Sequence, residues 1–436
     1  MRNVLKGLAI ATILASPALV HAETVTIACG PEDDELEQCE KGAQGWEKKT
    51  GHHVEFAHVP TDWHEQYTTF QKQLSEKNPK VDVYRVDVVW PGLLAEHFID
   101  LKLYVSDEVL EQHFPAIVQN NTVGGKLVAM PWFADAGLLF YRKDLLKKHR
   151  QKAPTTWEEL AEVAKKVQDA EHKAGNGKMW GFVFEAKAHE TLTCNALEWI
   201  DSVGGGTIVD EDGKVTINSQ KAVDALTRAA GWINKISPPE VLEYGEKEAL
   251  GVFLSGNAVF MRNWPEAWAK AKAKGGKLKC KVKGKCEVAV MALPKDGKDG
   301  KSTGTLGGWH LAVSRYSKHP EIAADLVKYL TSPEEQKRRA IKAAHNPSVM
   351  ALYNDPEVLK ANPFYRSLLE TFTNPVARPW QVTGRQYDRV SSEFFNAVHA
   401  VLSSSDMPED KLKDKTKDEL KGLQKTLERM SNDGKW

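Results

Sequence analysis

The sequence predicts an α/β protein whose strands form doubly wound sheets, and three observations support this fold class. Strand and helix patterns alternate as β-α-β-α-β over about the first hundred residues, an order typical of a parallel sheet. A valine-rich run at 81–92 (V-D-V-Y-R-V-D-V-V-W-P-G) lies between turn signals, as expected for a strand buried on both faces. The length of 436 residues is enough for two or more domains.

The first 22 residues are predicted to be a secretory signal peptide. Arg2 and Lys6 form a basic start, 8–14 form an apolar core too short to span a bilayer, and 20–22 form a small-residue cleavage site. No cysteine follows the cleavage site, so a lipid anchor is not indicated. We therefore exclude 1–22 from the fold and expect a secreted protein.

The chain after the signal peptide is almost electrically neutral, with 57 basic residues against 59 acidic ones. This balance argues against nucleic acid as the main partner. No later apolar run approaches the roughly 18 residues that a membrane-spanning helix needs, so stable membrane insertion is not expected. The motifs H-E-x-x-H and G-x-x-x-x-G-K-[ST] are absent. We therefore predict no enzymatic activity and no catalytic residue.

Five cysteines fit an oxidising compartment. Cys280 and Cys286 flank a short loop that a disulfide could close, and Cys29 and Cys39 could pair if the first strand ends beside the first helix. Cys194 lies inside an apolar helix pattern and is predicted to be a free buried thiol. No C-x-x-C motif is present, so neither a zinc site nor another metal site is expected.

The first half of the chain gives clear local signals. A strand at 24–28 is broken by Gly30-Pro31, and the helix at 32–46 begins with four acids, which suit its positive end. The remaining elements expected there are strands at 54–58, 81–90, 127–131 and 134–142, and helices at 63–74, 93–99 and from 143.

Capping residues mark helix starts in the chain from 154 onward. Thr156 and Glu159 form a capping box, and Ser332 precedes Pro333 at the first helical position. The expected strands are 179–184, 258–262, 288–293 and 309–313, and the expected helices are 191–203, 219–236, 246–254, 320–330 and 412–430. The segment 295–305 is rich in Gly, Lys and Ser and is predicted to be an exposed loop. After 347 the chain is expected to be almost entirely helical.

Asp87 and Trp90 stand at the carboxyl end of the valine-rich strand, where ligands bind in open α/β sheets. A carboxylate accepts hydrogen bonds from hydroxyl groups and an indole packs on apolar C–H faces, so the pair suits a neutral polyhydroxylated ligand. The alternative is that Asp87 caps a helix beginning near Pro91 and that Trp90 belongs to the core.

Five stretches occur in a recognisable order along the chain. They are D-V-Y-R-V-D-V-V-W-P-G-L-L-A (82–95), M-P-W-F-A-D-A-G-L-L-F-Y-R-K-D-L-L (130–146), P-T-T-W-E-E-L (154–160), F-L-S-G-N-A-V-F-M-R-N-W-P (253–265) and G-T-L-G-G-W-H-L-A-V (304–313). Together they resemble the sugar-binding proteins of bacterial ABC importers, which are extracellular solute-binding proteins of the maltose-binding type. Within that family the chain looks most like the trehalose, maltose and α-glucoside subgroup.

The resemblance implies a two-lobed periplasmic binding protein fold, with a doubly wound sheet in each lobe and hinge strands between the lobes. Lobe 1 is expected at 23–131 and 294–346, and lobe 2 at 132–293 and 347–436. The crossings are expected near 130–133, 292–294 and 346–349. The resemblance also implies a periplasmic monomer without cofactor that delivers its ligand to an ABC transporter permease.

The same resemblance implies a set of ligand-binding residues from both lobes. They are Glu32, Asp33, Asp87, Trp90, Asp135, Trp264, Gly308, Trp309 and Arg378. The acids would accept hydrogen bonds from the ligand, Trp264 and Trp309 would stack on it, and the Arg378 guanidinium would donate to sugar oxygens. Trp132, Trp380 and Arg385 are alternatives. The same residues also have purely structural explanations. The acids would stabilise a helix start or cap a turn, the indoles would belong to the core, and the arginine would form a surface ion pair.

The expected function is capture of trehalose, maltose or a related α-glucoside, and two alternatives stay open. A periplasmic glycosidase would use two of the many carboxyl groups as an acid and a nucleophile or base. A binding protein of the same scaffold would take a non-sugar solute, such as a phosphorylated glycerol compound or a polyamine. A phosphate would need more cationic groups than Arg85 and Arg378, whereas a polyamine would need a mainly acidic cleft.

Overall fold

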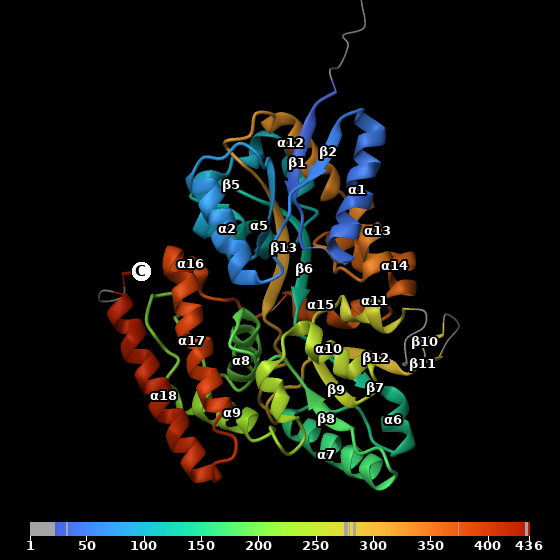
Figure 1. Cartoon of the computed structure of the whole chain (residues 1–436), viewed down its shortest axis with the longest axis vertical. Coiled ribbons are helices and arrows are strands. Elements are labelled where there is room, and N and C mark those ends of the chain that lie inside the picture. Colours follow the sequence, from blue (N-terminus) through green and yellow to red (C-terminus); the bar gives the residue numbers. More distant parts are fainter. Residues whose placement is uncertain are drawn as a thin grey trace, which may run out of the picture.

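The structure is a computed structural model that describes residues 22–31, 34–273, 278, 280–281, 285–373, 375–431 and 435–436. At 34, 280–281, 285–286, 370 and 372–373 it describes the backbone alone. The predicted signal peptide, apart from Ala22, and the predicted site residues Glu32 and Asp33 lie outside the described residues. Two α/β lobes are stacked along the long axis of the molecule (Figure 1). We call them the first and the second lobe, each defined by its sheet.

The first lobe is built on a five-stranded sheet. Its strands, in spatial order, are β2 (His53–Phe56), β1 (Thr24–Ala28), β3 (Val83–Asp87), β13 (Leu306–Val313) and β6 (Met130–Ala136). Strands β1, β2 and β3 pair in parallel, while β13 runs antiparallel to both of its neighbours. All five residues of β3 are buried, as the valine-rich run predicts. Helices α1 (Asp34–Thr50), α2 (Trp63–Ser75), α12 (Pro320–Leu330) and α13 (Pro333–Ala343) surround this sheet (Figure 1).

The second lobe is built on a four-stranded sheet. Its strands, in spatial order, are β12 (Val288–Ala292), β7 (Leu138–Arg142), β9 (Ala258–Asn263) and β8 (Trp180–Val183). Its larger helices are α7 (Trp157–Lys173), α8 (Glu190–Ser202), α9 (Gln220–Ala230), α10 (Glu246–Leu254), α17 (Tyr387–Leu402) and α18 (Glu409–Met430). Helix α17 packs against α8, α9 and α18, so the end of the chain lies on this lobe (Figure 1).

The shorter elements connect or cover these frameworks. They are α3 (Trp90–Leu94), η1 (Ala95–His97), η2 (Leu101–Leu103), α4 (Asp107–Leu110), α5 (Pro115–Asn120), β4 (Thr122–Val123), β5 (Lys126–Leu127), α6 (Lys143–Lys148), η3 (Pro239–Glu243), α11 (Ala267–Ala271), β10 (Cys280–Lys281), β11 (Lys285–Cys286), η4 (Met350–Asn354), α14 (Pro356–Ala361), α15 (Tyr365–Thr373), α16 (Trp380–Thr383) and η5 (Gly384–Gln386). No helix in the described part of the chain is long and apolar enough to cross a bilayer.

The chain passes from the first sheet to the second at Gly137, because β6 ends at Ala136 and β7 begins at Leu138. The continuous strand predicted at 134–142 is therefore wrong in this respect, since its two halves pair in different sheets. The chain returns between β12 and β13. Within this return, Thr303 and Thr305 are fully buried, so the prediction that 295–305 forms an exposed loop is wrong at its carboxyl end.

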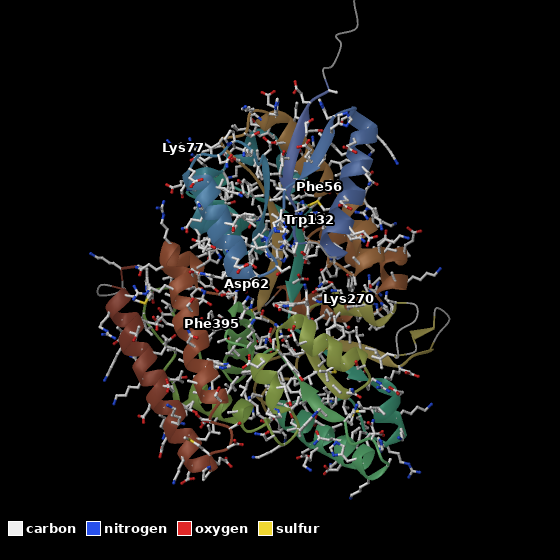
Figure 2. All side chains as sticks on the ribbon, viewed as in Figure 1. Phe56, Asp62, Lys77, Trp132, Lys270 and Phe395 are labelled. Atoms are coloured by element: carbon white, nitrogen blue, oxygen red, sulfur yellow. A yellow bond between two sulfur atoms is a disulfide. The ribbon has the colours of Figure 1, made fainter. Side chains whose placement is uncertain are left out.

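The Cys29–Cys39 disulfide joins the end of β1 to α1, as the sequence predicts. Cys194 is free and buried. Cys280 lies opposite Cys286 in the antiparallel pair of β10 and β11, but the side chains of both lie outside the described part of the structure. Figure 2 shows Trp132 inside the first lobe, and Asp62 and Lys270 near the boundary between the lobes.

Candidate functional site

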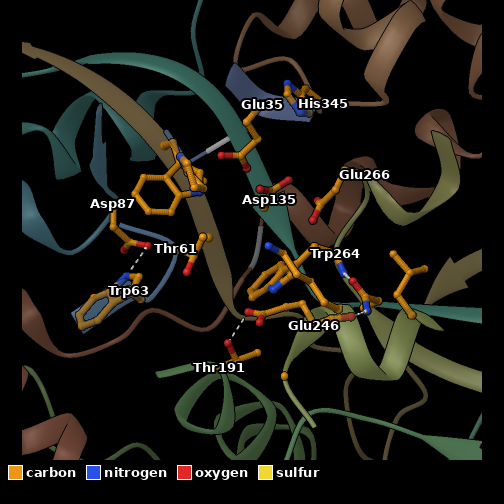
Figure 3. A pocket seen from close by; sticks show the side chains of 18 of the residues that line it. Glu35, Thr61, Trp63, Asp87, Asp135, Thr191, Glu246, Trp264, Glu266 and His345 are labelled. Carbon is orange, nitrogen blue, oxygen red and sulfur yellow. Dashed lines mark hydrogen bonds between the residues drawn. The ribbon is translucent and has the colours of Figure 1, made fainter. Parts of the chain in front are cut away.

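A cleft of about 730 Å³ lies between the two lobes. The first lobe contributes the carboxyl ends of β3 and β6 and the amino end of β13, which meet at one edge of the sheet because β13 is antiparallel. The second lobe contributes the end of β9 and the amino ends of α8 and α10. Figure 3 shows side chains from both lobes converging on this cleft.

Two half-buried indoles line the cleft, one from each lobe. The Arg85 guanidinium carbon lies 3.5 Å from the centre of the Trp309 ring, and that of Arg262 lies 4.1 Å from the Trp264 ring. Each guanidinium attracts the negative face of its ring and fixes the ring orientation. A Cβ atom added at Gly307 would lie 3.0 Å from the Trp264 ring, so the glycine lets this indole approach the first lobe closely.

Gly308 permits the backbone turn that presents Trp309. Its φ of +120° is in the region that favours glycine, and an added Cβ atom would lie 2.5 Å from the Phe133 carbonyl oxygen. Between Trp309 and His310 the register of β13 against β6 also shifts, as in a β-bulge. The Gly-Gly-Trp sequence therefore shapes the backbone at this edge of the cleft.

Arg378 connects the two lobes through two carboxylates. Its Nη2 donates to Asp87 Oδ1 at 3.0 Å, and its Nη1 donates to Glu190 Oε1 at 2.7 Å. Asp87 ends β3 in the first sheet, whereas Glu190 begins α8 in the second lobe. Burial raises the pKa of Glu190, while Arg378 beside it acts in the opposite direction. Asp87 also accepts a hydrogen bond from Trp63 Nε1 at 3.1 Å (Figure 3).

Asp135 is buried at the cleft wall and is only 6% exposed. Burial raises its pKa, Glu266 and Asp87 raise it further, and Arg262 acts against them. Figure 3 shows the carboxyl groups of Asp135 and Glu266 turned toward the same space. A carboxyl group in this setting can donate or accept a hydrogen bond, depending on its protonation.

The structure brings six of the nine predicted ligand-binding residues together. Asp87, Asp135, Trp264, Gly308, Trp309 and Arg378 all line the cleft. Trp90 does not line it: the ring is fully buried and packs edge-on against Trp309, with 5.5 Å between ring centres. It therefore supports the Trp309 ring from behind. Glu32 and Asp33 lie outside the described residues, but their neighbours Pro31 and Glu35 line the cleft.

The three alternative residues lie elsewhere. Trp132 is fully buried, with the Arg339 guanidinium carbon 4.6 Å from its ring centre. Trp380 Nε1 donates to Asn120 Oδ1 at 2.9 Å, and Arg385 forms an exposed ion pair with Glu96. None of the three contributes to the cleft wall.

The sequence did not lead to several other residues that line the cleft. They include Trp63 and Glu190, at the starts of α2 and α8, together with Thr61, Glu246, Glu266 and His345. Helix α2 follows β2 and α8 follows β8, so the rule that ligands bind beyond the carboxyl ends of strands would have indicated Trp63 and Glu190. Only Asp87 and Trp90 were derived in this way from the residues themselves.

Acidic and basic side chains are mixed along the cleft, and His189 and His345 lie among them. In the described part of the chain, no three His, Cys, Asp or Glu side chains are grouped so that they could hold a metal ion. The arrangement of flat rings, paired carboxylates and a guanidinium can bind a solute through stacking and many hydrogen bonds.

Residues 33–337 match the family described as "Bacterial extracellular solute-binding protein". The chain is 50% identical over 408 residues to the "Probable ABC transporter-binding protein" of Deinococcus radiodurans, covering 93% of this chain and 95% of that one. It is 26% identical over 292 residues to the galactooligosaccharide-binding protein of Bacillus subtilis, covering 63% and 60% of the two chains. The solved structure of maltose-bound MalE3 from T. maritima is similar, with 35% identity, a TM-score of 0.84, and 94% and 100% of the two chains covered.

Proposed function

Because this chain belongs to the family of bacterial extracellular solute-binding proteins, we propose that it captures a sugar between its lobes and delivers it to the permease of an ABC transporter. The proposed ligand is trehalose, maltose or a related α-glucoside. We further propose that the protein works as a monomer in the periplasm. The observation that carries the proposal is the pair of indoles, Trp264 and Trp309, which face one cleft from opposite lobes.

The chemistry of the cleft supports a neutral saccharide. Indole faces pack against the apolar C–H faces of a pyranose ring, while carboxylates and the guanidinium exchange hydrogen bonds with its hydroxyl groups. The cleft volume of about 730 Å³ falls within the range of roughly 300–1,000 Å³ that is common for small-molecule sites. Because the two rings belong to different lobes, a sugar stacked on both would favour the closed arrangement of the lobes.

The proposal is tested by calorimetric titration of the purified mature protein with trehalose, maltose, other disaccharides and glucose. A polyamine and a phosphorylated glycerol compound are included as non-sugar solutes. We expect one α-glucoside to bind most tightly, with no turnover of a chromogenic glucoside. A folded protein that binds no saccharide, that binds only a non-sugar solute, or that hydrolyses the glucoside would contradict the proposal.

Tryptophan variants then locate the binding. Trp264→Ala and Trp309→Ala should each weaken affinity about tenfold or more, because each removes one stacking surface. Trp180→Ala is the matched control, since its half-buried ring belongs to β8 and does not line the cleft. Equal affinities for the cleft variants and the control would show that the sugar binds elsewhere.

A further inference from the structure

We propose that the buried ion pair between Arg262 and Glu198 couples the Trp264 ring in the cleft to the connections between the lobes. Arg262 and Glu198 would then act as positioning residues, through which stacking on Trp264 and the hinge geometry depend on each other. This inference rests on the proposed function, since it concerns how the ligand and the hinge communicate.

One face of α8 lies along the chain where it passes between the lobes. Glu190, Cys194, Glu198 and Asp201 follow each other at spacings of three or four residues, so their side chains share this face. Asp201 accepts a hydrogen bond from Thr303 Oγ1 at 2.8 Å, and Glu190 pairs with Arg378 at 2.7 Å. Helix α8 thus contacts the connection that precedes β13 through Asp201. It also contacts Arg378, which is hydrogen-bonded to Asp87, through Glu190.

Glu198 touches both connections between the sheets. Its Oε1 accepts a hydrogen bond from the backbone N–H of Thr305 at 3.1 Å, just before β13 begins. A Cβ atom added at Gly137, where the chain leaves β6 for β7, would lie only 2.0 Å from the same oxygen. The hydroxyl group of Thr305 also donates to the Cys194 carbonyl oxygen at 2.8 Å. One carboxylate therefore contacts the outgoing and the returning connection.

Arg262 links Glu198 to the Trp264 ring in the cleft. Its Nε and Nη2 donate to the two oxygens of Glu198 at 2.9 and 2.5 Å, and its guanidinium carbon lies 4.1 Å from the Trp264 ring centre. Both side chains of the ion pair are fully buried. A two-point ion pair in a buried setting is rigid, because turning either group would leave a charge without its partner.

The packing leaves little freedom for these parts to move independently. Gly137 fits against the ion pair only because it has no side chain, and Trp264 lies over Gly307 of the first lobe. Rotation of the lobes about Gly137 and Thr305 must therefore move Glu198 relative to the connections or move the connections with it. In either case the displacement reaches the ring through the Arg262 guanidinium.

The test uses the full mature protein with the sugar that binds most tightly in the calorimetric screen. Glu198→Gln keeps the shape and removes the charge, and Arg262→Lys keeps the charge and removes the flat group under the ring. Glu185→Gln is the matched control, because Glu185 lies 3.5 Å from Arg262 and is bonded to Asn195, but has no contact with Gly137 or Thr305 among the described contacts. Affinity is measured by calorimetry, and lobe closure by the radius of gyration in X-ray scattering, with and without sugar.

We expect the two test variants to bind about fivefold or more weakly and to show a radius of gyration different from that of the wild type in the free or the bound state. The control should match the wild type in both measurements. Affinity and radius of gyration that equal those of the wild type in both test variants would overturn the inference. A loss of affinity with unchanged scattering would also overturn it, since the ion pair would then act on the ring alone.

The experiment still tests the inference if one variant does not fold or if the wild type binds no sugar. If Glu198→Gln does not fold, Gly137→Ala disturbs the same contact from the side of the connection, and wild-type behaviour of that variant would overturn the inference. If the wild type binds no sugar, the proposed function fails by itself. The radius of gyration of the free variants still tests whether the ion pair sets the hinge geometry.

Discussion

At the scale of single residues, the same arrangement occurs on both sides of the cleft. A buried arginine stacks on each indole, Arg85 on Trp309 and Arg262 on Trp264. Each arginine is paired in turn with a carboxylate, Glu35 in one lobe and Glu198 in the other. The charge is compensated by the carboxylate, so the flat face of the guanidinium remains available to orient the ring.

Glu185 leads to a prediction on pH. Burial raises its pKa to about 8, while Arg262 at 3.5 Å and the hydrogen bond from Asn195 act in the opposite direction. The unfolded chain loses this proton near the ordinary value of 4.5, so the folded state binds more protons between pH 4.5 and 8. The contribution of Glu185 to the free energy of unfolding should therefore decrease as pH rises through this range, by at most about 1.4 kcal/mol per pH unit.

Urea unfolding at several pH values measures this slope. Glu185→Gln should make the slope of the free energy of unfolding against pH more positive by up to one proton, whereas Glu162→Gln, on the exposed face of α7, should leave the slope unchanged. Identical slopes in the wild type and Glu185→Gln would mean that Glu185 is already ionised in the folded protein.

Cleft residues were predictable from the sequence where they lie at the end of a strand or within a motif of the family that the chain resembles. Asp87 was predicted from a strand end, and Asp135, Trp264, Trp309 and Arg378 from the resemblance, and all of these line the cleft. The Glu198–Arg262 ion pair could not be predicted, because its partners are 64 residues apart and each reads as an ordinary helix or strand residue. Trp90 was predicted from the same strand end as Asp87, but its ring is buried, because a place at a strand end does not decide whether a ring faces the cleft or the core.

At the scale of elements, the Cys29–Cys39 disulfide ties β1 to α1 beside the cleft. The two cysteines are separated by 10 residues, and closing a loop of this length restricts the unfolded chain by about 3 kcal/mol. The double variant Cys29→Ala/Cys39→Ala should lower the free energy of unfolding by a similar amount, measured by urea denaturation. Reductant should destabilise the wild type toward the level of the variant. The response of the variant itself to reductant reports any other disulfide. Equal stability of the oxidised wild type and the variant would refute the prediction.

The contact between α3 and α16 gives a second prediction for elements. A Cβ atom added at Gly92 would lie 2.0 Å from Cζ3 of Trp380, so this helical glycine makes room for the indole. Gly92→Ala should displace Trp380, break its hydrogen bond to Asn120, and lower the free energy of unfolding by about 1–3 kcal/mol.

Gly422→Ala in α18 is the matched control for this change. Apart from the neighbouring backbone of α18 itself, no described atom lies within 4 Å of a Cβ atom added there, so the higher helix propensity of alanine should stabilise the protein by up to about 1 kcal/mol. Thermal unfolding of both variants measures whether each substitution lowers or raises the stability of the protein. Stabilisation by Gly92→Ala would show that α16 does not pack against α3 as described.

Element order was largely predictable, while sheet membership was not. The alternation of strands and helices gave the parallel part of the first sheet correctly. The split at Gly137 was missed because 134–142 has one continuous apolar pattern, and local pattern does not reveal that its halves pair with different partners. The return through 295–305 looked like solvent-exposed chain by composition, yet Thr303 and Thr305 are buried because their hydroxyl groups bond to α8.

At the scale of the whole molecule, the lobes share a core as well as a cleft. Ala134 and Ala136 from β6 pack in one apolar cluster with Leu138 and Phe140 from β7, together with Tyr365 of α15. This continuous core holds the two sheets together at the crossing, whereas the cleft separates their edges. The division of the chain into 23–131 with 294–346 and 132–293 with 347–436 stays a prediction, and limited proteolysis of the sugar-bound protein is suited to test it.

The last prediction concerns acid stability and involves both lobes. His113, His310 and His345 are buried, and burial lowers the pKa of His113 to about 4, that of His310 to about 3 and that of His345 well below its ordinary value. The unfolded chain takes up these protons near pH 6.5, so the stability that the neutral rings contribute is present above pH 6.5 and is lost as pH falls toward 4. As pH falls, each histidine should lower the free energy of unfolding by at most about 1.4 kcal/mol per pH unit, while the raised pKa values of Glu185, Asp135 and Glu190 act in the opposite direction. Urea unfolding between pH 7 and 5 measures the slope, and the difference between a histidine variant and the wild type isolates the contribution of one ring. His310→Leu should reduce the slope by one proton even if it lowers stability at every pH, while His58→Gln, at an exposed position, should leave the slope unchanged. A wild-type slope in His310→Leu would show that this ring already carries a proton in the folded protein, or that burial does not hold it neutral.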